Sequence, residues 1–162
     1  ALYKTQRSLR KQYKLTISTM SAARKGNFGE ICTDLDFYEK GYDVLHVNRV
    51  NSIDSPIQQG IDHIFKNPQT GEFIIVESKF HGTGGLSTLV DGTRQMSDTW
   101  IRGGHTLNTN NRLWMALGQD TSLYNQVAYN YKRVIAYVQP DGTINYKYVS
   151  SDGYEISTPF LN

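Results

Sequence analysis

The strongest constraint on the fold is a run of apolar residues, Phe73–Val76, that leads directly into Glu77, Ser78 and Lys79. A continuous apolar run, rather than an alternating one, is typical of a strand covered on both faces of its sheet. Burying a carboxylate and an ammonium costs several kcal/mol each unless they are paired or bind a metal. The run therefore predicts a central strand, Glu72–Phe80, that ends in either a structural ion pair or a functional site.

The segments before this strand supply its neighbours. Apolar residues at helical spacing predict a helix over Asn27–Lys40, which Gly41 ends. Tyr42–Val50 alternates as a strand does, and Ile61–Phe65 forms a second strand, joined to Glu72–Phe80 by turn residues at 67–71. We therefore expect a helix followed by three strands, the last two as a hairpin.

The second half of the chain adds helices and another hairpin. A glycine-rich polar loop begins at His81, and helices are predicted over Thr93–Ile101 and Asn111–Leu117. Two strand patterns, 132–139 and 143–150, flank a Pro-Asp-Gly turn. This order of elements predicts an α/β (mixed α+β) fold in which helices flank a mixed β-sheet.

Composition limits what kind of protein this is. A chain of 162 residues with 38% hydrophobic content indicates one globular domain. A single cysteine, Cys32, excludes an intramolecular disulfide framework and a four-cysteine zinc site. No apolar run approaches the roughly 20 residues of a membrane-spanning helix, so we expect no membrane-spanning segment.

Charge is unevenly placed along the chain. Residues 1–25 hold basic residues and no acidic ones, whereas the remainder is acidic, although the net charge is only +2. We therefore expect residues 1–25 to form a basic N-terminal arm or the remnant of a delivery segment, and residues 26–162 to form the functional domain. Such an arm could follow a nucleic-acid backbone or be a solvated tether.

Three residues are predicted to share one side of the sheet. Residues two apart in a strand point to the same face, so Glu77 and Lys79 stand roughly 6–7 Å apart. Asp62 lies on the preceding strand, where cross-strand neighbours have Cβ atoms about 5 Å apart, so it falls beside Glu77 in a favourable register. Two converging carboxylates suit a hard divalent ion such as Mg²⁺ or Mn²⁺. The structural alternative is an ion pair between Lys79 and either carboxylate.

Glu30 and the histidines are further candidates. Glu30 could join the acidic group, or it could instead cap the helix start together with Asn27. His63 should face away from Asp62, because adjacent strand residues point to opposite faces. His81 shares the side of Glu77 and Lys79 and could contact phosphate. If the ion were zinc, a histidine would be an expected extra ligand.

The order of these residues resembles the PD-(D/E)xK nuclease superfamily, in which a helical Glu is followed by an Asp on one strand and by E-x-K on the next. The proline that commonly precedes the Asp is absent here, and Ile61 takes its place. Four blocks are also similar to nuclease toxin domains at the C-termini of bacterial polymorphic toxins, of the contact-dependent inhibition, filamentous haemagglutinin-like and Rhs types: RKGNFGEI, GIDHIF, VESKF and RQMSDTWI.

The resemblance implies a three-layer, restriction-endonuclease-like core and roles for individual residues. Asp62 and Glu77 would bind the metal with Glu30 as an additional acid, and Lys79 would orient or activate the attacking water. Gln95 matches a glutamine that many members carry on the helix after the core strands. The expected reaction is metal-dependent cleavage of DNA; the alternatives are cleavage of tRNA on the same fold and a non-catalytic nucleic-acid-binding module.

The resemblance also implies a biological setting. The expected partner, besides the nucleic acid, is a cognate immunity protein in the producing cell. The toxin would be part of a larger secreted or cell-surface protein and would act in the cytoplasm of the target cell. The chain begins at Ala1 and its first methionine is Met20, which fits a fragment of a longer protein.

Overall fold

The predicted buried strand is β3 (Phe73–Phe80), and it lies inside a six-stranded sheet in the computed structural model, which describes residues 2–160. The strand order is β1-β2-β3-β4-β5-β6. β3 pairs in parallel with β4, and every other neighbouring pair is antiparallel. The other strands are β1 (Asp43–Val44), β2 (His63–Lys66), β4 (Tyr131–Val138), β5 (Ile144–Val149) and β6 (Glu155–Pro159). The predicted mixed α/β class is confirmed.

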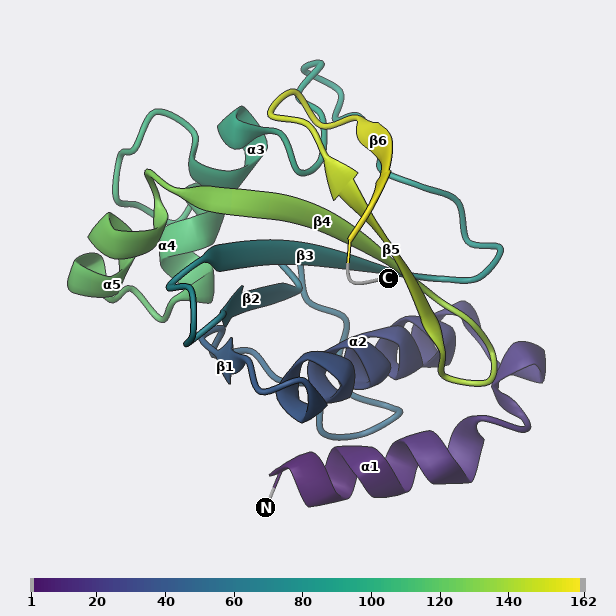
Figure 1. The fold of residues 1–162 in the computed structure, drawn as a ribbon. Helices are drawn as coiled ribbons and strands as arrows, with labels where there is room; N and C mark the ends of the chain where they lie inside the picture. Colours follow the sequence, from purple (N-terminus) through teal and green to yellow (C-terminus); the bar gives the residue numbers. More distant parts are fainter. Residues whose placement is uncertain (1, 161–162) are drawn as a thin grey trace.

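Helices cover both faces of this sheet (Figure 1). On one face Phe73 and Ile75 pack with α3 (Asp98–Arg102), α4 (Arg112–Ala116) and α5 (Thr121–Val127). On the other face Ile74 and Val76 pack with Phe37 of α2 (Ala22–Glu39). Because side chains of a strand alternate between faces, Glu77 and Lys79 belong to the α3–α5 face and Ser78 belongs to the α2 face.

α2 begins earlier than the sequence pattern indicates. The Ser21 side chain caps it by accepting a hydrogen bond from the Arg24 N–H, so Asn27 lies inside the helix. Asn27 instead donates to the carbonyls of Ile53 and Ser55, at 2.8 Å each. The alternative in which Glu30 caps the helix start together with Asn27 is therefore wrong, and Glu30 is left without that structural role.

Other element boundaries also differ from expectation. The strand predicted over Tyr42–Val50 is reduced to β1, and β2 begins at His63, one residue after Asp62. The helix predicted over Thr93–Ile101 begins only at Asp98, because Met96 has a left-handed backbone (φ 68°) and Ser97 is the N-cap. Gln95 therefore lies in the turn before α3, not on the helix. The second hairpin forms as predicted, from β4 and β5.

The basic N-terminal segment is a helix packed against α2, not a solvated tether. α1 (Leu2–Tyr13) is followed by a short 3₁₀ helix, Ile17–Thr19, and α1 lies beside α2 in Figure 1. Gln6 is fully buried, and the rings of Tyr3 and Tyr38 stack at 3.5 Å between centroids. Residue 25, where we expect the arm to end, lies within α2.

None of the helices in residues 2–160 has the length and hydropathy that crossing a bilayer requires.

We predict that Gln6→Ala lowers the free energy of unfolding by about 1–3 kcal/mol, because it leaves buried polar partners unsatisfied. Gln12→Ala is the matched control, since Gln12 is an exposed glutamine on the same helix. Urea denaturation of both variants measures the difference. Equal stability of the two variants would contradict the docking of α1.

Candidate functional site

The carboxylate of Asp62 lies where β2 and β3 cease to pair. The last paired residues are His63 and Val76, so the register directs Asp62 toward Glu77. Beyond them, Asp62 Oδ2 accepts a hydrogen bond from the Ser78 N–H at 3.0 Å. A side-chain carboxylate thus replaces a backbone carbonyl as the partner of β3, which fixes Asp62 against the strand that carries Glu77.

Glu77 is buried between two polar side chains. Its Oε1 lies 3.8 Å from Lys79 Nζ and accepts a hydrogen bond from Gln95 Nε2 at 2.8 Å. Gln95 reaches it although the helix starts later than expected, because the Ser87 N–H and hydroxyl donate to Gln95 Oε1. Glu77 Oε2 is buried and has no hydrogen-bond partner among the described residues. A buried oxygen without a partner is costly for a carboxylate, and it is open to an added ligand.

Glu30 approaches this group from α2. It follows Gly29, where α2 passes close to the sheet: a Cβ on Gly29 would lie 3.9 Å from the Phe80 nitrogen. Glu30 and Asp62 line one small recess. Burial, and then the negative charge of Asp62, raises the pKa of Glu30 to about 9. The structure thus brings Glu30, Asp62, Glu77, Lys79 and Gln95 to one place.

The three carboxylates of Glu30, Asp62 and Glu77 carry more negative charge than Lys79 can neutralise. Burial raises the pKa of Glu77 well above its ordinary value, and the charge of Asp62 raises it further, while Lys79 opposes both. Such carboxyl groups either retain protons or bind a cation. Oxygen ligands of this kind suit a hard divalent ion.

The two histidines nearest to the site in sequence have different surroundings. His81 is exposed just after β3, where its backbone N–H donates to the Val138 carbonyl. His63 faces α2, away from Asp62, as the alternation of the strand predicts. There its Nδ1 lies 2.8 Å from Asp34 Oδ1.

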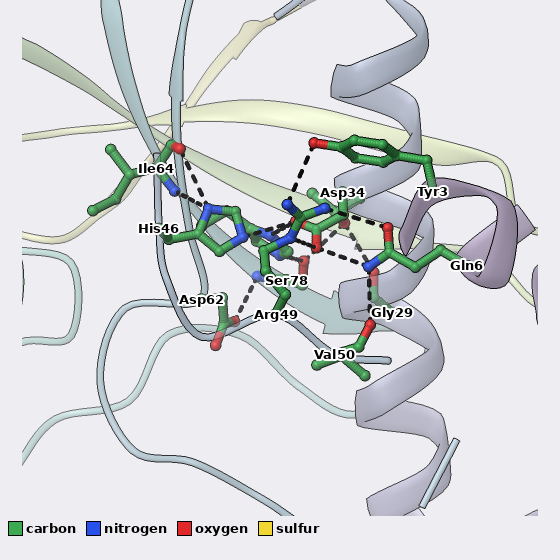
Figure 2. Close-up of polar contacts among 12 residues, drawn as sticks. Tyr3, Gln6, Gly29, Asp34, His46, Arg49, Val50, Asp62, Ile64 and Ser78 are labelled. Carbon is green, nitrogen blue, oxygen red and sulfur yellow. Dashed lines mark hydrogen bonds and ion pairs between the residues drawn. The ribbon is translucent and has the colours of Figure 1, made fainter. Parts of the chain in front are cut away.

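Asp34, which the sequence analysis missed, is the centre of a buried network behind the site (Figure 2). Its Oδ1 lies 2.9 Å from His46 Nε2 and 2.8 Å from His63 Nδ1. Its Oδ2 accepts from Gln6 at 3.0 Å and from Arg49 at 2.8 Å. Burial acts to raise the pKa of Asp34, but the charges and hydrogen bonds of His46 and His63 outweigh burial and hold it well below the ordinary value.

Hydroxyl groups and the backbone contact the far side of both histidine rings. The Thr33 hydroxyl donates to the Gly29 carbonyl, so it accepts from the Ser78 hydroxyl at 2.8 Å. The Ser78 hydroxyl also lies 2.6 Å from His63 Nε2. Burial lowers the pKa of His46, and its Nδ1 accepts from the Ile64 N–H at 3.0 Å.

The same side chains could hold a metal ion. One ligand atom each from Asp34, His46 and His63 lies within 4.8 Å of the others. Binding there would require His63 to release the proton on Nδ1 and His46 the proton on Nε2, both of which now bond Asp34. The Ser78 hydroxyl and the Ile64 backbone would then orient the two rings from behind.

Comparisons with known proteins give no independent assignment of this site. No protein-family model matches the chain, and neither a curated protein nor a solved structure shows significant similarity to it.

We predict that the metal-free protein becomes less stable as pH rises from about 4.5 to about 9. The unfolded chain releases the Glu30 proton above its ordinary pKa of 4.5, whereas the folded protein keeps it up to about 9. Each carboxyl group with a raised pKa lowers the free energy of unfolding by up to about 1.4 kcal/mol per pH unit within this range. Thermal melts in EDTA across this range measure the trend.

The variant that tests this pH dependence is Glu77→Gln, which removes one raised carboxyl and should flatten the curve. Asp43→Asn, at an exposed carboxylate of β1, is the control. A wild-type stability that rises steadily between pH 4.5 and 9 would contradict the charge balance described above.

We predict that Asp34→Asn destabilises the protein by about 3–5 kcal/mol, because it leaves the Arg49 guanidinium and the ring nitrogens of His46 and His63 without their buried carboxylate partner. The control is Asp54→Asn, which breaks an exposed ion pair with Arg24 and should change little. Chemical denaturation compares the two variants, and a neutral effect of Asp34→Asn would contradict the network.

Proposed function

We propose that this protein is a nuclease that hydrolyses DNA phosphodiester bonds with a divalent metal ion. The observation that carries the proposal is the unpartnered buried oxygen of Glu77, which lies in one group with Asp62, Glu30 and Lys79. A structural ion pair would account for Lys79 and Glu77 alone. It would not account for two further carboxylates beside them.

Each residue of the site would have a separate role in such a reaction. Asp62, Glu77 and Glu30 would hold the ion, which would polarise a phosphate oxygen and lower the pKa of a bound water. Gln95 holds Glu77 Oε1 and so leaves Oε2 for the ion. Lys79 supplies a positive charge beside Glu77, where negative charge grows on the phosphate during attack.

The ligand chemistry favours Mg²⁺ or Mn²⁺, since all three candidate ligands are carboxylates. Zinc would suit the group of Asp34, His46 and His63 better, because it contains two histidines. The two places can be separated by measuring Mn²⁺ and Zn²⁺ binding to the wild type, to Glu77→Gln and to His46→Asn. Mn²⁺ binding should depend on Glu77 and be indifferent to His46.

DNA is the preferred substrate for two reasons. A water nucleophile needs no 2′-hydroxyl, and no pair of histidines lies among the proposed catalytic groups to act as acid and base on RNA. The resemblance to the PD-(D/E)xK superfamily adds the second reason, because that superfamily is dominated by DNA-cleaving enzymes. The same resemblance supports a toxin delivered into competing cells, with a cognate immunity protein as its partner.

We predict that duplex DNA is cleaved in Mg²⁺ or Mn²⁺ and not in EDTA. Asp62→Asn, Glu77→Gln and Lys79→Met should each lower the rate at least about 100-fold while the protein stays folded. Asp43→Asn and Lys132→Met are matched controls at exposed positions of β1 and β4, and they should keep full activity. Linear and supercoiled DNA and tRNA serve as substrates, and circular dichroism checks the fold.

The outcomes separate the elements of the proposal. Cleavage of tRNA without cleavage of DNA would overturn the choice of substrate. Cleavage that persists in EDTA would overturn the metal mechanism, and retained activity in two of the three site variants would overturn the assignment of residues.

A further inference from the structure

The recess beside the carboxylates continues into a larger pocket of about 560 Å³. The pocket and the recess of Glu30 and Asp62 share three lining residues, Asn48, Gln59 and Ile61. Because Ile61 directly precedes Asp62, the pocket begins next to the proposed site. Its volume is within the range of pockets that enclose small organic ligands.

The lining of this pocket combines apolar side chains, uncharged polar groups and one pair of opposite charges, Asp91 and Arg112. Ile61 and Met115 are apolar, whereas Asn48, Gln59 and Asn110 present side-chain amides. Within residues 2–160 these three amides make no hydrogen bond to another protein side chain or carbonyl. An amide offers a donor and an acceptor together, which is the pairing that the edge of a nucleobase presents.

Arg112 adds a fixed guanidinium to the lining. It stacks 4.7 Å from the centroid of the Trp100 ring and donates from Nη1 to the Trp100 carbonyl at 2.9 Å. The charge of Asp91, which lines the same pocket, acts on this guanidinium. A guanidinium held in this way presents its remaining N–H groups to a ligand with little loss of side-chain freedom.

A small hairpin forms part of the pocket wall. The bridge between Thr88 and Arg94 brings its two arms together, and Leu89 near its tip lines the pocket. The neighbouring Val90 is fully exposed. An apolar side chain at such a place could occupy the gap that a nucleobase leaves when it moves out of a stack.

We propose that this pocket binds one unstacked nucleobase of a polynucleotide, next to the phosphate that lies at Asp62 and Glu77. The proposal rests on the proposed nuclease function and deepens it. A paired base is stacked inside the duplex and cannot enter a pocket, so the bound nucleotide comes from a single strand or is extruded. The protein should therefore favour single-stranded or locally opened substrates.

The experiment measures binding in EDTA, where no metal-dependent cleavage interferes. Fluorescence anisotropy compares a 12-nucleotide single-stranded DNA, the same sequence as duplex, the same sequence as RNA, and an abasic oligomer of equal length. The abasic oligomer retains the phosphates and lacks every base. It therefore separates contacts to bases from contacts to the backbone.

Thr99→Trp is the test variant, because Thr99 is an exposed residue of α3 that lines the pocket and a large ring there fills it. Thr70→Trp, at the exposed turn between β2 and β3, is the control. We expect Thr99→Trp to weaken binding of the single strand by about 5- to 150-fold. Binding of the abasic oligomer should stay unchanged, and Thr70→Trp should bind as the wild type does.

Two results would overturn the inference. One is equal affinity of the wild type for the single strand and for the abasic oligomer. The other is an equal loss of affinity for these two oligomers in Thr99→Trp. If either binding result were found but the protein still cleaved DNA, the nuclease proposal would remain intact. Base-dependent binding without cleavage in any metal would support the pocket and overturn the nuclease proposal instead. Comparison of the DNA and RNA strands shows which sugar the neighbouring contacts accept.

Discussion

The carboxylate of Asp34 is the interaction on which the rest of the structure depends. It accepts hydrogen bonds from Gln6 of α1, from His46 and Arg49 after β1, and from His63 of β2. A buried carboxylate is tolerated only when such donors surround it, so these segments are held to α2 together. The helix that carries Asp34 also carries Glu30, and the network therefore sets the position of one proposed ligand.

The same network reaches the other proposed ligands through Ser78. Its hydroxyl is held by His63 and Thr33 on the α2 face of the sheet, and its N–H holds Asp62. Its neighbours Glu77 and Lys79 point to the opposite face. One residue thus connects a rigid polar network on one face to the acidic group on the other. Positioning groups of this kind keep catalytic side chains within a narrow range of geometry.

Local patterns in the sequence predict the part of this arrangement that depends on local geometry. The apolar run of β3 identifies the central strand, and the two-residue period of a strand brings Glu77 to the side of Lys79 and turns His63 away from Asp62. Asp34 shows the limit of that reasoning. Its partners come from separate segments of the chain, and no spacing within α2 reveals them. The only local signal is a charged residue among the buried positions Ile31, Cys32 and Leu35.

The parallel pairing of β3 with β4 has a consequence for the way the chain folds. All of residues 81–130, including α3, α4 and α5, lie between these two strands, whereas short connections join β2 to β3 and β4 to β5. Closing so long a loop is slow, so hairpins and helices form before the central pair does. Until then β3 has an apolar, unpaired edge, which is the kind of segment that associates with other chains. The edges of β3 and β4 that pair with each other are therefore open to association with other chains until the central pair forms.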